Sequence, residues 1–131
     1  MRGLLLDTHV WFWHLVGSPR LPEELRAAID DARDHCWLSP ISVWELGKLA
    51  ARGRVEIDRE YGTWVEEARR RFPLHEAPLT FEIAVRSLEL ELPHEDPADR
   101  FLAATALSSD LKLATLDRRL TSSAWLPTIP A

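Results

Sequence analysis

The hydrophobic residues of this chain form short continuous runs, separated by longer stretches in which apolar residues recur at helical spacing. The first run, Leu4 to Leu6 in "LLLDTHVWFW", has no polar alternation, which is typical of a strand buried on both faces. Similar runs in "CWLSP", "LKLAT" and "LPTIP" predict further short strands, and "FPLHEAP" predicts a short strand or a loop.

The stretches between these runs predict helices. They are "LPEELRAAIDDAR", residues 40 to about 52, a part of "REYGTWVEEARRRF", "LTFEIAVRSLEL" and "DPADRFLAATAL", with one more turn in "LDRRL". Ser39, Thr80 and Asp96 stand where N-caps are expected. For the helix after Thr80, we predict an apolar face of Ile83, Ala84 and Leu88.

Short strands that alternate with helices indicate parallel βαβ units. We therefore predict an α/β protein, a three-layer α/β/α sandwich with a short-stranded, mainly parallel sheet. A length of 131 residues suits one domain, which we expect to span residues 1–131.

Composition narrows the class of protein. An apolar content of 46% with six tryptophans predicts a globular fold. The single Cys36 suits a reducing compartment, and Asp7 ends the first apolar run too early for a signal peptide. We therefore expect a soluble, cytoplasmic protein without a membrane span. The net charge of -5 means that a nucleic-acid partner would need local arginines or metal ions.

Five acids have positions that suggest a common site. Asp7 follows the first strand, where ligands of open α/β sheets bind, although it could equally cap the next helix. Asp96 and Asp99 fall in one helical turn and could be capping acids, with Asp99 and Arg100 as a surface pair. Asp117 follows the "LKLAT" strand, and Glu45 lies in mid-helix.

If these acids converge, their like charges need a cation between them. Oxygen ligands without a Cys or His cluster favour Mg²⁺ or Mn²⁺. Zinc is disfavoured because Cys36 has no thiol partner and the histidines have no ligand spacing; these are His9, His14, His35, His75 and His94. His9 or His14 could act as a nearby base, or could be structural.

Four segments, "LLLDTHVWFW", "SPISVWELGKL", "LPHEDPADRFLAATAL" and "LATLDRRL", together resemble the PIN-domain ribonucleases, and most closely the VapC-type toxins of bacterial toxin–antitoxin pairs. The resemblance covers essentially the whole chain. It implies that Asp7, Glu45 and Asp99 form the acidic core and that Asp117 is a more variable fourth acid. Asp96 would be an accessory or capping acid, and Thr8 and Thr115 match small hydroxyl positions beside the acids.

The resemblance implies a Mg²⁺- or Mn²⁺-dependent endoribonuclease that leaves a 3′-hydroxyl and a 5′-phosphate. Asp7, Asp99 and Asp117 would hold metal directly or through water, and Glu45 would orient or deprotonate the attacking water. The substrate would be single-stranded or loop RNA, held by Arg52, Arg54 and the Arg69 to Arg71 run, although that run also suits a solvated helix end.

The family also implies an antitoxin whose helix packs in an apolar groove beside the acids, and we expect a homodimer. Trp11, Trp13, Trp44 and Trp64 exceed what a core of this size needs, although buried tryptophan is commonly core. The alternatives are a PIN-domain RNA-processing nuclease without an antitoxin, an inert PIN scaffold and a phosphoacceptor receiver domain. A receiver would need adjacent acids after its first strand, and an aspartate phosphatase would need an acid where His9 stands.

Overall fold

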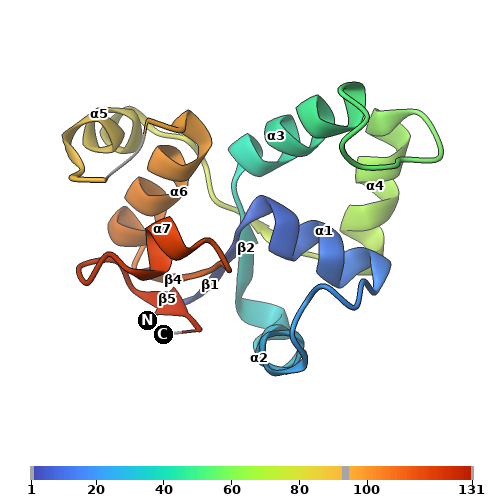
Figure 1. The fold of residues 1–131 in the computed structure, drawn as a ribbon, viewed down its shortest axis with the longest axis horizontal. Coiled ribbons are helices and arrows are strands. Elements are labelled where there is room, and N and C mark those ends of the chain that lie inside the picture. The colour runs from blue at the N-terminus through green and yellow to red at the C-terminus, as the bar shows by residue number, and fades with distance from the viewer. Residues whose placement is uncertain (1, 93–94, 131) are drawn as a thin grey trace.

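The computed structural model describes residues 2–92 and 95–130, which contain a five-stranded sheet flanked by helices (Figure 1). Its strands are β1 (Gly3–Leu6), β2 (Cys36–Leu38), β3 (His75–Glu76), β4 (Leu111–Ala114) and β5 (Thr128–Ile129). The order across the sheet is β3-β2-β1-β4-β5, and each neighbouring pair is parallel. The predicted strands and the predicted parallel sheet are confirmed.

Apart from the helix after Asp7, which was expected only under one of the two interpretations of that residue, the helices lie where the spacing predicts them. They are α1 (Thr8–Val16), α2 (Glu23–Asp31), α3 (Pro40–Ala51), α4 (Tyr61–Arg71), α5 (Phe81–Glu89), α6 (Pro97–Ser108) and α7 (Arg118–Thr121), with a short 3-10 turn at Arg33–His35. Ser39, Thr80 and Asp96 are N-caps whose side chains accept backbone N–H bonds. None of the helices in the described ranges is long and apolar enough to cross a membrane.

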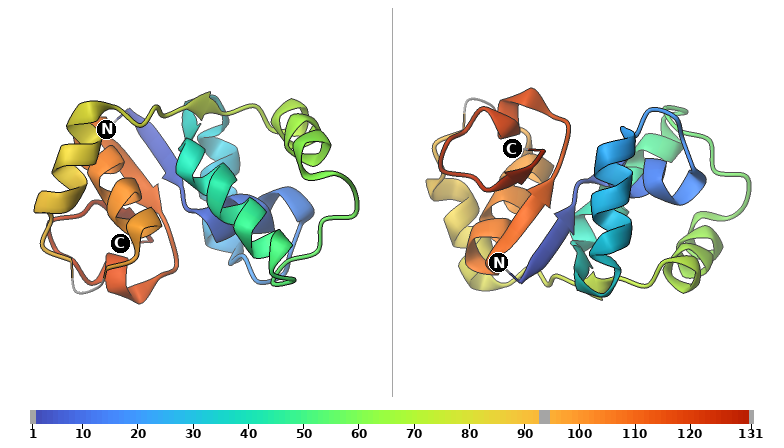
Figure 2. Two further views of the ribbon diagram at one scale, coloured as in Figure 1. Left: turned by 90° about the horizontal axis from the view of Figure 1, so that it is seen from above. Right: turned by 90° about the horizontal axis from the view of Figure 1, so that it is seen from below.

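The sheet separates two hydrophobic cores, because successive residues of β1 point to opposite faces. Leu4 and Leu6 belong to a core that includes side chains of α1, α2 and α4. Leu5 belongs to a second core with side chains of α6 and α7. The elements accordingly lie in two groups on either side of the centre of the sheet (Figure 2). The predicted three-layer α/β arrangement is confirmed.

Strand β1 lies at the centre of the sheet, and the chain leaves it in both directions. It continues to β2 and β3 on one side and returns to β4 and β5 on the other. The carboxyl end of β1 is therefore a topological switch point, where the loops on either side diverge and leave a crevice. Asp7 is the first residue after this strand.

The predicted apolar face of α5 is wrong. Ile83 is buried as predicted, but Ala84 is exposed and 81% of Leu88 is accessible. The face toward the protein instead carries Ile83 and Ser87, and α5 packs on α6. Other apolar side chains of this helix, including Leu88, point outward.

Candidate active site

Asp7 directly follows β1 and is also the N-cap of α1. Its position at a strand end and its role as a helix cap are therefore both observed. Its Oδ1 accepts a hydrogen bond from the Thr8 backbone N–H (2.7 Å), which fixes it as the N-cap of α1. Its Oδ2 accepts one from the Thr115 hydroxyl (2.6 Å), which comes from the end of the neighbouring strand β4. The carboxylate is therefore held in one orientation at the switch point of the sheet.

Asp96 and Asp99 lie in the first turn of α6. Asp96 Oδ1 accepts a hydrogen bond from the Ala98 N–H (3.0 Å), so Asp96 is the predicted cap. Asp99 is only 6% exposed, which excludes the interpretation of Asp99 and Arg100 as a surface pair. A carboxylate is rarely buried unless it serves a partner or a ligand.

Asp117 caps α7 and is linked to Asp7 through one hydroxyl group. The Asp117 backbone N–H donates to Thr115 Oγ1 (3.1 Å), and the same hydroxyl donates to Asp7. The Arg119 guanidinium lies 3.0 Å from Asp117 Oδ2 and 3.6 Å from Asp99 Oδ2. A positive charge from the chain itself therefore sits between two of the acids.

Glu45 reaches the same region from the middle of α3, where its side chain is half-buried. The Thr8 hydroxyl is fully buried and makes no hydrogen bond of ordinary geometry with the described residues. It nevertheless lies close enough to the Glu45 carboxylate to favour the charged form of that group. Thr8 and Thr115 thus lie beside Glu45 and Asp7, as the resemblance predicts.

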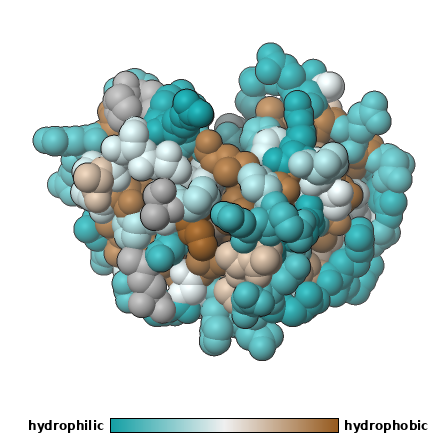
Figure 3. Space-filling model, turned by 60° about the horizontal axis from the view of Figure 1, so that its bottom comes forward, coloured by the Kyte–Doolittle hydropathy of each residue, from teal (hydrophilic) through white to brown (hydrophobic). Residues whose placement is uncertain are grey.

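These acids surround one cleft of about 350 Å³. Its walls come from α1 and α3 on one side and from α6 and the turn before α7 on the other; the acids that line it are Asp7, Glu45, Asp96, Asp99 and Asp117. Figure 3 shows a notch in the surface between two lobes of the molecule, with hydrophobic residues gathered along the middle of the face below it. The predicted convergence of the acids is therefore found in the structure.

The environment of these acids opposes their negative charge. Burial, and after it the charges of Asp96, Asp7, Asp117 and Glu45, together raise the pKa of Asp99 to about 8. Burial also raises the pKa of Asp7, against the hydrogen bonds from Thr115 and Thr8, and raises the pKa of Glu45. Only a cation in the cleft would let all of these groups ionise together.

The donor set fits a hydrated divalent ion. Within the described ranges no three His, Cys, Asp or Glu side chains are placed to hold one ion together. Mg²⁺ needs no such cage, since it keeps several of its waters and binds through one or two carboxylates and substrate phosphates. The carboxylate and hydroxyl oxygens of the cleft suit that mode of binding.

Zinc does not fit the cleft. His9 lines it, but His14 is bonded to Asp30 (2.8 Å) and His75 to the Asp34 carbonyl (2.9 Å). Cys36 is buried in the core. His94 lies outside the described residues. The predicted preference for a hard cation agrees with this placement.

The sequence interpretation missed the arginines of the cleft. The expectation that Arg52, Arg54 and the Arg69 to Arg71 run hold RNA around the site stays a prediction, whereas the described lining of the cleft itself contains Arg20 and Arg119. The Arg69 to Arg71 run ends α4, as a solvated helix terminus would. Arg119 could have been found because it stands two residues after Asp117; nothing in the sequence places Arg20 here.

Comparisons with known proteins agree with this geometry. Residues 4–126 match the PIN domain family. The chain is 32% identical over 125 residues to Ribonuclease VapC22 of Mycobacterium tuberculosis, an alignment that covers 93% of this chain and 92% of that protein.

Solved structures share the fold at lower identity. A DNA-bound VapBC from Salmonella typhimurium has a TM-score of 0.72 at 20% identity, covering 98% of this chain and 97% of that one. VapBC2 from Rickettsia felis, bound to a promoter DNA fragment, has a TM-score of 0.71 at 13% identity, covering 96% of each chain. These likenesses extend over nearly the whole chain.

Proposed function

This chain belongs to the PIN-domain family and is a ribonuclease of the VapC type, and on that premise we propose that it cleaves RNA with Mg²⁺ or Mn²⁺ bound in the acid cleft. The convergence of five acids from four segments of the chain carries this proposal. The other acids, taken alone, have capping or surface explanations, whereas the buried Asp99, with its pKa raised to about 8, has neither. Membership of the family removes the receiver-domain and phosphatase alternatives.

The acids have different proposed roles in the reaction. Asp7, Asp99 and Asp117 hold the ion directly or through water, and Thr115 orients Asp7 by its hydrogen bond. A divalent ion bound there supplies an activated water and screens the charge of the phosphoryl oxygens. Glu45 would orient that water or accept its proton, a role that its position at the cleft beside Thr8 supports.

The two remaining polar groups have supporting roles. Asp96 is a capping acid that holds the first turn of α6, and therefore Asp99, in place. Arg119 neutralises Asp117 and Asp99 in the absence of substrate and is positioned to contact a substrate phosphate. Cleavage should leave a 3′-hydroxyl and a 5′-phosphate. Single-stranded or loop RNA is the expected substrate, and the cytoplasm the expected site of action.

Cleavage of RNA by the purified chain tests this proposal. We expect cleavage of single-stranded RNA with Mn²⁺ or Mg²⁺, none with EDTA, and a loss of about 100-fold or more in Glu45→Gln, in line with removal of a general base. Cleavage that continues in EDTA, or that is unchanged in Glu45→Gln, would show that the activity does not reside in this cleft.

We further propose that a cognate antitoxin occupies an apolar groove of about 300 Å³ between α3 and α4, lined in part by Leu38, Val43, Val65 and Leu74. The solved relatives named above are VapBC assemblies, and the groove adjoins the N-terminus of the helix that carries Glu45. Co-expression of the operon should recover a small protein that binds this chain. A chain that is alone in its operon would favour an RNA-processing nuclease without an antitoxin.

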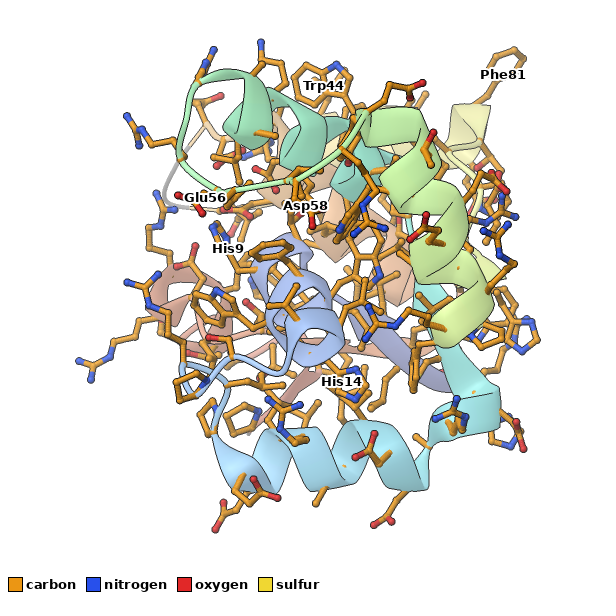
Figure 4. All side chains as sticks on the ribbon, turned by 90° about the vertical axis from the view of Figure 1, so that its right-hand side faces the viewer. His9, His14, Trp44, Glu56, Asp58 and Phe81 are labelled. Atoms are coloured by element: carbon orange, nitrogen blue, oxygen red, sulfur yellow. The ribbon has the colours of Figure 1, made fainter. Side chains whose placement is uncertain are left out.

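A homodimer is proposed from the outer face of α5. Phe81, Val85 and Leu88 follow one side of this helix and are 95%, 57% and 81% exposed, and Figure 4 shows Phe81 projecting into solvent. Three large apolar side chains in a row on one helix mark an interaction surface. Leu88→Glu should convert the dimer to a monomer in light scattering, whereas Thr63→Glu on the exposed side of α4 should not. An unchanged dimer in Leu88→Glu would exclude this face.

A further inference from the structure

The acid cleft has a second wall that the cleavage chemistry does not use. His9 and Trp13 lie one turn apart on α1, with ring centroids 5.4 Å apart and ring planes at 50°. Arg20, in the loop after α1, places its guanidinium carbon 5.6 Å from the centre of the Trp13 ring. All three residues line the same cleft as the acids.

These rings differ from the aromatic residues of the core. Trp11 is 1% exposed and Trp64 is 8% exposed, and both are packed in the hydrophobic core. Trp13 is only partly buried, and His9 is exposed. Figure 4 shows His9 and His14 leaving α1 on opposite sides, with His14 directed toward α2, where it bonds to Asp30. His9 makes no such structural bond among the described residues.

The spacing of residues along α1 determines how far Trp13 lies from the acids. Asp7 is the N-cap of the helix, and Trp13 lies six residues further on, which corresponds to about 9 Å along the helix axis. A phosphate bound in the cleft beside Asp7 would therefore have an adjacent nucleotide within reach of the Trp13 ring. The cleft volume of about 350 Å³ lies in the range of small-ligand sites.

We propose that His9, Trp13 and Arg20 form a nucleobase-binding subsite, in which the base next to the scissile phosphate stacks on Trp13. This inference rests on the ribonuclease function proposed above. Aromatic rings and arginine planes are the groups on which unpaired bases stack, and the charge of Arg20 suits the RNA backbone. An arginine-rich peptide would also be drawn to the acids, but it would meet Arg20 and Arg119 at the rim.

Binding of a short single-stranded oligoribonucleotide tests the subsite without relying on cleavage. The measurement compares the intact strand with versions that lack one base, in the Asp99→Asn background to suppress cleavage. We expect one abasic position to weaken binding about 5- to 150-fold, the range for loss of one base stack. In Trp13→Ala, removal of the same base should weaken binding by almost no further amount, because the stack is already absent.

Three variants control for folding and for charge. Trp13→Phe should keep most of the abasic penalty, since it retains an aromatic face. Trp125→Ala removes an exposed tryptophan outside the cleft, 39% accessible, and should keep the whole penalty. Arg20→Ala should weaken binding of all strands and reduce the salt dependence by about one phosphate contact.

The outcomes separate the two proposals. An abasic penalty of equal size with Trp13 and with Trp13→Ala would overturn the subsite, whether or not the wild type cleaves RNA. A wild-type chain that shows the coupling but no Mn²⁺-dependent cleavage would overturn the ribonuclease chemistry and leave the base-binding subsite standing. Cleavage by Trp13→Ala with an unchanged KM would also count against the subsite, because the lost stack should raise KM more than it lowers kcat.

Discussion

The acid cleft and the apolar groove are two hollows of nearly the same size, about 350 and 300 Å³, with opposite linings. The cleft is built mainly from helix N-termini, since Asp7, Asp96 and Asp117 cap α1, α6 and α7. The apolar lining of the groove comes from the sides of helices, at Val43 of α3 and Val65 of α4, and from β2 and the segment before β3. Helix ends supply oriented charge to the cleft, whereas apolar side chains supply most of the groove.

This difference determines what each hollow can bind. Helix N-termini favour negative charge, each by about 0.3 to 1 kcal/mol. Burial and mutual repulsion nevertheless win at Asp99, because its pKa rises to about 8. The cleft therefore favours binding of a cation. The lining of the groove includes one arginine and one glutamate beside its apolar side chains, has no cluster of like charges, and so favours a mainly apolar partner.

Neutralising one acid should give the largest difference between the two hollows, because it should impair the function of the cleft and leave that of the groove unchanged. Asp99→Asn removes one of the proposed metal-binding oxygens and should lower RNA cleavage by about 100-fold or more, comparable to the loss of one preorganised charge-stabilising group. Binding of the antitoxin should be unchanged. Steady-state cleavage and equilibrium binding of the same preparations measure both effects. Loss of partner binding together with cleavage would mean that the hollows are not independent.

Removing the hydroxyl between two acids tests how the cleft is held. Thr115→Val leaves the Asp7 carboxylate and the Asp117 N–H without the bonds of 2.6 and 3.1 Å that they share through Thr115. We expect metal-dependent activity to fall about 10- to 100-fold, as for other groups that orient metal ligands. Thr115→Ser retains the hydroxyl and should behave as wild type. Equal activity in both variants would remove Thr115 from the site.

A charge in the groove should have the converse effect. Val65→Glu places a carboxylate on the groove wall. The helix should tolerate this change, because the new glutamate can pair with Arg69 one turn later. Antitoxin binding should weaken by about 30-fold, which corresponds to the loss of a hot-spot contact of roughly 2 kcal/mol. Cleavage by the free chain should be unaffected. Thr63→Glu places the same group on the exposed side of α4. If Thr63→Glu weakens binding as much as Val65→Glu does, the groove is not the docking site.

The pH dependence of stability should come from the cleft. Because the folded-state pKa of Asp99 is raised from 3.8 to about 8, the unfolded chain releases this proton at lower pH than the folded chain does. Metal-free stability should therefore fall as pH rises from about 4 to 8, by at most about 1.4 kcal/mol per pH unit from this group. Urea titrations in EDTA should show a shallower dependence in Asp99→Asn. An identical dependence would mean that Asp99 ionises normally.

Most of the fold and the acids of the site could be predicted from the sequence, because local rules determine them. The run of Leu4 to Leu6 ending at Asp7, and the cap and proline at Asp96 and Pro97, require no knowledge of the rest of the chain. Convergence of the acids at strand ends followed from the expectation that parallel strands end at one edge of the sheet, whereas Glu45, in the middle of α3, was placed with them by the family resemblance. The roles of these acids in catalysis stay predictions until the variants are measured.

What the sequence did not reveal depends on contacts between distant segments. Arg20 reaches the cleft because its loop folds back beside Trp13, which no spacing rule encodes. The outward face of α5 was predicted incorrectly because periodicity identifies apolar positions but not which of them a neighbouring helix will cover. Trp44 is likewise 56% exposed and lies next to buried positions of α3.

Thermal melts of wild type and Asp99→Asn, each in EDTA and in Mn²⁺, test the central claim that the acids form a cation site rather than a set of helix caps. We predict that Asp99→Asn is as stable as wild type or more so in EDTA, because it relieves repulsion. Saturating Mn²⁺ should stabilise wild type by about 2.7 kcal/mol at 100 times the dissociation constant and should affect the variant much less. A variant that is destabilised in EDTA by about 0.5 to 1 kcal/mol, with an unchanged response to Mn²⁺, would contradict the account and identify Asp99 as a capping residue.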